Sequence, residues 1–308
     1  MERHGVLLVD KPGGMTSHDV VGAVRKLAGQ KSVGHTGTLD PLATGLMLLV
    51  LGEATKISDY LTAEDKRYLV DIQLGVESDT LDRDGKVSPC SDRRVEESEI
   101  REACEGLLGE FEWPVPHYSA VKVGGKPLHI SARRGEETET PTRPMSFWDL
   151  RYVSWDAPSQ RLQVEISCTK GSYIRTWVQQ LGQALKVGGI VQELRRLSIG
   201  NWAIAEAVSL PQLQEMGQEA LDSVLRPLNA CLPGLRTLVA DGREARLVQN
   251  GQIPRDFMAR LVPEQKQAFT SQNPVVVKVV SGSGGLLALI SAQQGQGLKI
   301  KRVFRSFP

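Results

Sequence analysis

Apolar and polar positions change along the chain between the alternating period of strands and the wider period of helices. The apolar run GVLLVDKP (5–12) ends at a proline, which predicts a short strand. The next stretch, TSHDVVGAVRKLAG, opens with a capping-box pattern at Thr16 and Asp19, continues with apolar residues at helical spacing, and closes at Gly29. The start of the chain therefore predicts a strand followed by an amphipathic helix.

The same patterns recur over the next two hundred residues. Apolar runs or alternation predict further strands over 46–51, 68–74, 86–88, 162–168 and 194–199. Helical spacing predicts helices over 53–61, 96–108, 176–185, 210–216 and 220–228. Prolines between Trp113 and Pro144 predict a loop-rich segment there. The strands are spaced too irregularly for repeated βαβ units, which favours an α+β fold with a mixed, largely antiparallel central sheet and flanking helices.

The last seventy residues become β-like. The runs VVVKVV, LLALIS and LKIKRVF predict strands, and SGSGG between the first two is a hairpin signal. We therefore expect one domain over 1–235, with an insertion at about 113–145, and a small domain over 236–308. The stretch 255–272 shows no pattern that we can place.

Composition narrows the class of protein. The chain has 308 residues, of which 41% are hydrophobic, enough for a sizeable core. Neither a signal peptide nor a run long enough to span a bilayer is visible, so we expect no membrane association. The four cysteines are scattered without a CxxC pair, so structural zinc is not expected and free thiols indicate the cytoplasm.

Charge is unevenly distributed although the net charge is only +1. Residues 266–308 hold six basic side chains and no acid, whereas residues 92–112 hold eight acids and three arginines. Such segregation fits a basic face for a polyanion. A solvated basic tail beside an acidic surface helix explains it equally well.

The stretch GHTGTLDPLATG (34–45) carries the most distinctive candidate chemistry. An Asp before Pro usually caps a turn, but Gly37 and Gly45 would also let a backbone or ligand approach Asp40 closely. A lone carboxylate can act as nucleophile, base or metal ligand. Glycosidic hydrolysis normally uses two carboxylates; no second acid stands near Asp40 in the sequence, and a partner from a remote segment is left open. The acidic stretch 77–85 does not fit a calcium loop, and nucleotide and zinc motifs are missing.

Several segments together resemble a known family. GHTGTLDPLATGLMLLVLGEATK is similar to the catalytic motif of the TruB family of bacterial tRNA pseudouridine-55 synthases. Further resemblances follow in family order: LLVDKPGGMTSHDVV, DKRYLVDIQLGVESDTLDRDG, VPHYSAVKVGGKPLHISARRG, CTKGSYIRTWVQQLG and LRRLSIG. They cover roughly residues 5–200. The resemblance implies a pseudouridine synthase fold and conversion of a uridine in the tRNA T-loop to its C-glycoside isomer. The N1–C1′ bond breaks, a C5–C1′ bond forms, and no cofactor is needed.

The resemblance assigns the catalytic roles to three residues. Asp40 is the essential carboxylate, acting on C1′ of the ribose or on C6 of the base. Arg175 pairs with it, and a cation at a helix start is otherwise disfavoured. Tyr68 stacks on the flipped base and moves the C5 proton. Without the resemblance, Tyr68 would be interpreted as a core residue of a strand.

Four further residues are expected to bind substrate. Tyr173 and Leu194 match positions of the base pocket, and His35 matches a histidine that occupies the space left by flipped bases. Lys11 is either phosphate-facing or structural. His129 departs from the family pattern, which has a tyrosine there, and this puts in doubt how the insertion packs on RNA.

The resemblance also implies partners. The final segment is similar to the small β-barrel PUA module, which suggests contact with acceptor-stem phosphates in addition to the T-stem-loop. The family resemblance implies a monomer, and the short chain without basic tails and with a bacterial-style insertion favours an enzyme that needs no obligate protein partner. Two alternatives stay open: a tRNA-folding chaperone whose role does not depend on Asp40, and a glycosidase-like hydrolase that releases uracil.

Overall fold

The computed structural model describes residues 2–136, 138–271 and 273–305. Strand β1 (Gly5–Lys11) runs antiparallel to β3 (Thr44–Leu51), and helix α1 (Ser17–Ala28) follows β1 in the chain. The hydroxyl of Thr16 caps α1, and Gly29 ends it in the left-handed conformation with φ 64°. The opening strand and capped helix predicted from the sequence are confirmed.

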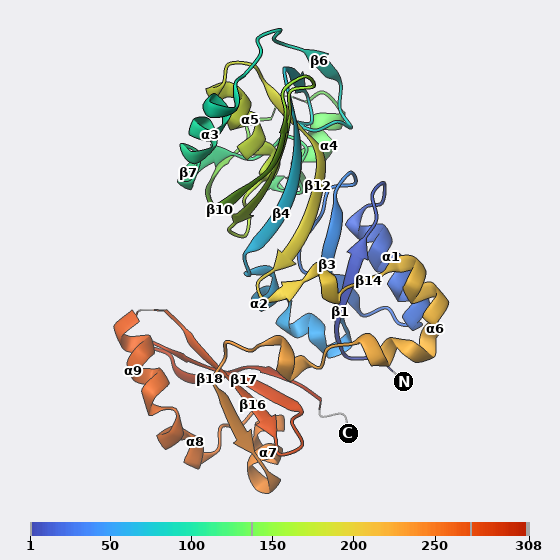
Figure 1. Cartoon of the computed structure of the whole chain (residues 1–308). Helices are drawn as coiled ribbons and strands as arrows, with labels where there is room; N and C mark the ends of the chain where they lie inside the picture. Colours follow the sequence, from blue (N-terminus) through green and yellow to red (C-terminus); the bar gives the residue numbers. More distant parts are fainter. Residues whose placement is uncertain (1, 137, 272, 306–308) are drawn as a thin grey trace.

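Over the described residues, ten strands form the central sheet (Figure 1). The hydrogen-bonded order is β14-β1-β3-β12-β4-β11-β10-β7, with β2 beside β3 and β13 beside β12. The remaining strands are β2 (Val33–His35), β4 (Lys66–Leu74), β7 (Gly109–Pro114), β10 (Thr142–Asp156), β11 (Arg161–Cys168), β12 (Gly189–Ile199), β13 (Trp202–Ala203) and β14 (Val208–Ser209). Most neighbours are antiparallel, while β12–β3 and β1–β14 are parallel. The expected α+β fold with a mixed, largely antiparallel sheet is confirmed.

Short helices and two small hairpins surround this sheet (Figure 1). The helical segments are η1 (Gly52–Ile57), α2 (Ser58–Thr62), α3 (Glu97–Glu105), α4 (Leu128–Arg133), α5 (Ile174–Ala184), η2 (Ile204–Glu206), α6 (Leu210–Val224) and η3 (Leu228–Cys231). The hairpins pair β5 (Val76–Ser78) with β6 (Val87–Pro89) and β8 (Lys122–Val123) with β9 (Lys126–Pro127). Helix α6 is interrupted at Gly217, whose φ is 72°, so the predicted break between two helical segments is confirmed, although the second segment ends at Val224 and not at 228.

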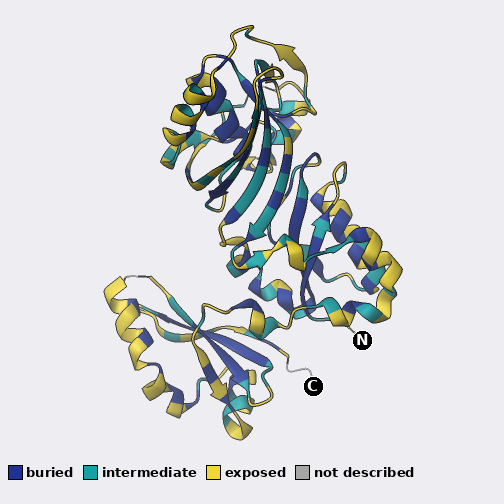
Figure 2. Ribbon diagram, in the orientation of Figure 1, coloured by how far each residue is buried: buried dark blue, intermediate teal, exposed yellow. Residues whose placement is uncertain are grey.

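The continuous apolar runs of β1 and β3 are explained by burial on both faces (Figure 2). Leu7 and Val9 pack into one core with α1 and α5, whereas Val6 and Leu8 pack into a second core. The second core also contains Phe304 from the end of the described chain. The central strands are therefore held rigidly from both sides.

The C-terminal residues form a smaller sheet with three helices. Its strands are β15 (Thr237–Ala240), β16 (Val275–Ser281), β17 (Leu286–Gln293) and β18 (Gly297–Val303), and its helices are α7 (Gly242–Gln249), α8 (Arg255–Arg260) and α9 (Val262–Ser271). The SGSGG hairpin is confirmed by the hydrogen bond from Ser281 N to Gly285 O, 2.8 Å. The described strands pair in the linear order β15-β16-β17-β18, so the expected small sheet domain is present but as an open sheet and not a barrel. The boundary at 235/236 stays a prediction.

Strand β10 is the largest element that the sequence pattern did not predict. It is mostly exposed, and its apolar alternation is broken by a register shift around Asp149, whose φ is 53°. A bulge of this kind moves successive side chains off the regular period of two. The hydrophobic pattern therefore gave no strand signal here. Helices α8 and α9 occupy most of the other stretch that showed no pattern.

Candidate active site

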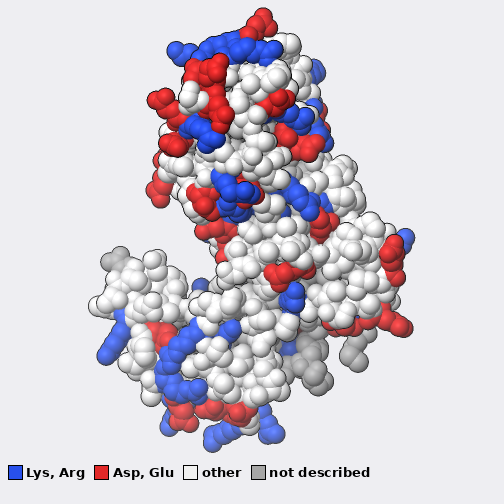
Figure 3. All heavy atoms as spheres, in the orientation of Figure 1, with Lys and Arg blue, Asp and Glu red and all other residues white. Residues whose placement is uncertain are grey.

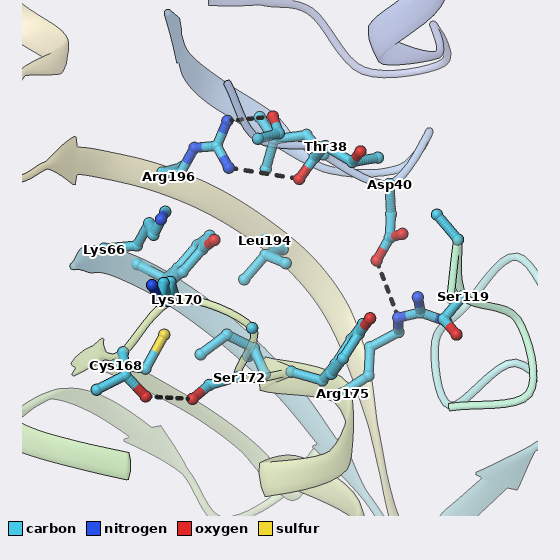
Figure 4. A pocket seen from close by; sticks show the side chains of 18 of the residues that line it. Thr38, Asp40, Lys66, Ser119, Cys168, Lys170, Ser172, Arg175, Leu194 and Arg196 are labelled. Atoms are coloured by element: carbon cyan, nitrogen blue, oxygen red, sulfur yellow. Dashed lines mark hydrogen bonds and ion pairs between the residues drawn. The ribbon is translucent and has the colours of Figure 1, made fainter. Parts of the chain in front are cut away.

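A cavity of about 250 Å³ opens beside β4 and β12, next to the loop that precedes β3. Its walls come from the loop 36–40 before β3, from β4 and β12, and from the turn 168–175 that leads into α5. Figure 4 shows Asp40 and Arg175 facing each other at one end, with Lys66 and Cys168 toward the other. Segments far apart in the sequence thus meet around one small space.

Asp40 and Arg175 form an ion pair at this cavity. Arg175 Nε lies 2.9 Å from Asp40 Oδ2, and the two side chains are 4% and 31% exposed respectively. The guanidinium also donates to the carbonyls of Thr80 and Tyr118, each at 2.9 Å. Asp82 Oδ2 is 3.7 Å from Nη1. The buried guanidinium of Arg175 is therefore fixed by two backbone carbonyls and two carboxylates. Of these two carboxylates, the more exposed one, Asp40, faces the 250 Å³ cavity.

Asp82 lies behind this pair and is almost fully buried. Burial raises the pKa of its carboxyl, and hydrogen bonding from Thr80 and the charge of Arg175 oppose the shift. Asp82 also accepts from the backbone N–H of Asp84 at 3.1 Å. In the sequence Asp82 is only one of the acids of the stretch 77–85, because nothing local shows that it lies beside Arg175, which is 93 positions later.

Tyr68, Tyr173 and Leu194 line the same cavity as the ion pair. Tyr68 comes from β4 and Leu194 from β12, while Tyr173 is the N-cap of α5. Burial raises the pKa of both tyrosine hydroxyls, so both are protonated at neutral pH. The cavity is therefore walled by two aromatic rings and one aliphatic side chain, and a planar base can stack on these surfaces.

Arg196 was missed by the sequence analysis and is central to the local structure. Its buried guanidinium donates to Leu46 O at 2.6 Å, to Gly37 O at 3.2 Å and to Thr38 O at 3.4 Å. These bonds tie the loop before Asp40 to β12, as Figure 4 shows for Thr38. Gly45, with φ 105°, lets β12 approach, because a Cβ there would overlap the backbone of Arg196.

Lys66 and Cys168 were also missed as lining residues. Burial lowers the pKa of the Lys66 ammonium to about 8 and raises the pKa of the Cys168 thiol to about 12. Lys66 Nζ donates to Thr62 O at 2.9 Å, where it satisfies a carbonyl at the end of α2. Cys168 is therefore a neutral thiol at neutral pH.

Two residues expected to bind substrate, Lys11 and His35, do not line the 250 Å³ cavity. Lys11 is fully buried outside the cavity, and its Nζ donates to the carbonyls of Pro12, Met15 and Pro41 at 2.7–3.3 Å. Of the two roles left open for Lys11, these bonds support the structural one, because its donors hold the loop that follows Asp40. His35 lies in β2 and lines a second, larger cavity of about 830 Å³, which Asp40 and Arg175 also line. Burial lowers the pKa of its imidazole.

Neither a metal site nor a membrane-spanning helix is found in the described part of the chain. Among residues 2–136, 138–271 and 273–305, no three His, Cys, Asp or Glu side chains come together as a metal site. Within the same residues, every helix is too short or too polar to span a bilayer. The chemistry available at the 250 Å³ cavity is that of the Asp40 carboxylate beside a fixed guanidinium, with aromatic walls.

Comparison with known proteins identifies the family. Residues 25–174 match the family model of the TruB family pseudouridylate synthase N-terminal domain, and residues 175–233 match that of the tRNA pseudouridylate synthase B C-terminal domain. A tRNA pseudouridine synthase B of Bdellovibrio bacteriovorus is 38% identical over 98% of this chain and 97% of its own. One of Aromatoleum aromaticum is 41% identical over 81% of this chain and 80% of its own.

The fold is shared with more distant proteins. A solved structure of a Cbf5-Nop10-Gar1 complex contains a chain that aligns with a TM-score of 0.71 at 20% identity, over 98% of this chain and 85% of that one. At this identity the likeness concerns the fold alone. The large mixed sheet, the two family models and the curated relatives agree: the chain belongs to the TruB family and is a tRNA pseudouridine synthase.

Proposed function

We propose that the chain isomerises uridine 55 in the T-loop of tRNA, with Asp40 as the essential carboxylate. The observation that carries this proposal is the 2.9 Å ion pair between Asp40 and Arg175 at a cavity walled by aromatic rings. The guanidinium places a fixed positive charge beside this carboxylate at the cavity. The carboxylate then acts on C1′ or on C6 while the N1–C1′ bond breaks.

The remaining walls have roles that follow from their chemistry. The flipped uracil stacks on Tyr68, with Leu194 and Tyr173 closing the space around it. As C5 bonds to C1′, C5 loses its proton and N1 gains one, so no redox partner or cofactor is consumed. Because Tyr68 is protonated at neutral pH, we propose that its hydroxyl relays a proton as a donor and acceptor and does not act as a tyrosinate base. His35 contacts the nucleotides next to the target from the larger cavity.

The small C-terminal sheet domain is proposed to contact acceptor-stem phosphates. Lys and Arg side chains gather on its visible face in Figure 3, and Lys299, Lys301 and Arg302 on β18 are exposed. Lys278 does not belong to this surface, because its Nζ donates to Asn229 O and Leu232 O at 2.8 and 2.9 Å. The protein is proposed to act in the cytoplasm as a monomer.

Mapping the modified nucleotide tests the substrate assignment. A tRNA transcript is incubated with the protein, and pseudouridine is located by carbodiimide labelling and primer extension. We expect one new stop, at position 55, that is lost when this uridine is replaced by cytidine. Stops at other uridines, with none at 55, would contradict the T-loop assignment while leaving the family membership intact.

A further inference from the structure

The catalytic arginine is oriented partly by the insertion. Arg175 Nη2 donates to Tyr118 O, which belongs to the insertion, and Nη1 donates to Thr80 O, which belongs to the turn between β5 and β6. These two carbonyls fix the plane of the guanidinium, and with it the direction in which Nε faces Asp40. A shift of the peptide after Tyr118 would therefore move one of the two groups that form the ion pair.

The segment around Tyr118 has no strand of its own to hold it. Residues 117–120 form bends between β7 and β8. This segment and the residue after it instead accept from the start of helix α4: His129 N donates to Ser119 O at 3.1 Å, and Leu128 N donates to Val121 O at 2.8 Å. The first N–H groups of a helix lack partners within the helix. The insertion thus uses the open end of α4 to hold the segment that carries Tyr118 O.

The side chain of His129 adds a third hydrogen bond to the two that the backbone of α4 makes with this segment. Its Nδ1 lies 3.0 Å from Ser119 O, the acceptor that its own backbone N–H also uses. A carbonyl oxygen can only accept, so Nδ1 carries the proton. The imidazole also lines the larger cavity that Asp40 and Arg175 border. His129 is thus linked to the ion pair by Ser119 O, the neighbouring Tyr118 O and Arg175.

We propose that His129 is a positioning residue for the reaction: its Nδ1–H holds Ser119 O, and this places Tyr118 O so that Arg175 is aimed at Asp40. The inference rests on the proposed role of the Asp40–Arg175 pair. This positioning role is distinct from an RNA contact, because Nδ1 of His129 bonds to a protein backbone carbonyl, Ser119 O. Loss of the bond slows the chemical step and leaves the affinity for RNA almost unchanged.

Three substitutions of His129 and one control substitution separate a positioning role from an RNA contact. His129→Ala removes the donor. His129→Asn keeps a nitrogen donor close to the place of Nδ1, whereas His129→Gln reaches the place of Nε2 and loses the bond. Ile130→Ala, on the same helix and 38% exposed, is the matched control. Each variant is checked for folding by thermal melting before use.

The measurements are the single-turnover rate of pseudouridine formation at saturating enzyme and the Kd for a T-stem-loop RNA. We expect the rate to fall about three- to tenfold in His129→Ala and His129→Gln, as befits one neutral hydrogen bond. We expect His129→Asn to keep most of the rate, Ile130→Ala to match wild type, and Kd to change less than about twofold. If His129→Ala does not fold, the contrast between Asn and Gln carries the test.

Two outcomes would overturn the inference. The first is an unchanged rate in all three His129 variants. The second is a weaker Kd in Ala and Asn alike with an unchanged saturating rate, which would make His129 an RNA contact. Inactive wild-type protein would instead contradict the proposed function itself, so the two failures can be told apart.

Discussion

The loop that carries Asp40 and the insertion that faces it are held by different kinds of contact. Within the described residues, the loop is tied to the core by buried side chains: Ser17 Oγ bonds both Leu39 N and Leu39 O, Arg196 bonds the carbonyls before Asp40, and Lys11 bonds the one after it. The segment of the insertion around Tyr118 is tied by the backbone of α4, by one imidazole and by Arg175, and its neighbours Val121 and Leu128 pack into the main core. The Asp40 loop is therefore held by several buried polar side chains, whereas the segment that orients Arg175 has fewer side-chain hydrogen bonds.

The largest effect on the Asp40 side is expected from Gly45→Ala. A Cβ at this position would lie 2.6 Å from Arg196 N, with φ at 105°. The contact is with backbone and cannot be relieved by a rotamer change, so we expect a loss of about 3 kcal/mol or more in unfolding free energy. Denaturant unfolding measures it. Gly34→Ala, where the nearest atom is a Val50 methyl at 3.6 Å, is the control and should cost less than about 1 kcal/mol.

A pH-dependent effect is expected from the buried Lys11. Burial lowers the pKa of its ammonium from 10.5 to about 8. Between these values the unfolded chain binds more protons than the folded protein, so the stability of wild type relative to Lys11→Met rises as pH increases. The gain is up to about 3 kcal/mol. Denaturant unfolding of both proteins from pH 7 to 10.5 measures the difference, and a difference that stays flat or shrinks would contradict this placement.

A smaller effect is expected from Arg196→Lys. One ammonium cannot reproduce the fork that reaches Leu46, Gly37 and Thr38 at once, so we expect a loss of about 2 kcal/mol in unfolding free energy and a slower single-turnover rate. Arg195→Lys is the matched control, because Arg195 pairs with Asp10 at 2.7 Å near the surface. It should cost less than about 1 kcal/mol. Equal losses of stability in the two variants would contradict the claim that Arg196 anchors the Asp40 loop.

The smallest change in stability is expected on the insertion side. His129→Ala should lower the unfolding free energy by less than about 1 kcal/mol, because it removes one partly exposed hydrogen bond. The same variant is expected to slow the reaction. A stability loss as large as that of Arg196→Lys would show that the insertion is anchored as firmly as the Asp40 loop, and the contrast between the two sides would fail.

The sequence predicted local features well and distant contacts poorly. The capped first helix, the two helices separated at Gly217 and the SGSGG hairpin follow from neighbouring residues, and all are present. Strand β10 was not predicted because a bulge disturbs its alternation. The closed barrel was expected from resemblance alone, and the described strands form an open sheet.

The site shows the same division. The pairing of Asp40 with Arg175 was expected from the resemblance to a family, which supplies the long-range information that spacing lacks. Arg196 and Asp82 were missed because their partners lie far away in the chain: the bond from Arg196 to Gly37 spans 159 positions. The role of Lys11 stayed open at the sequence level, because a motif lysine looks the same in sequence whether its ammonium faces a phosphate or three carbonyls.

The central claim is that Asp40 drives isomerisation of a flipped uridine. The most direct test is tritium release from a T-stem-loop RNA labelled at C5 of the target uracil, comparing wild type with Asp40→Asn. Isomerisation must expel the C5 hydrogen, whereas RNA folding or plain hydrolysis of the N-glycoside need not. We expect release by wild type and none by Asp40→Asn at equal RNA affinity. Release by both proteins would remove Asp40 from the chemistry.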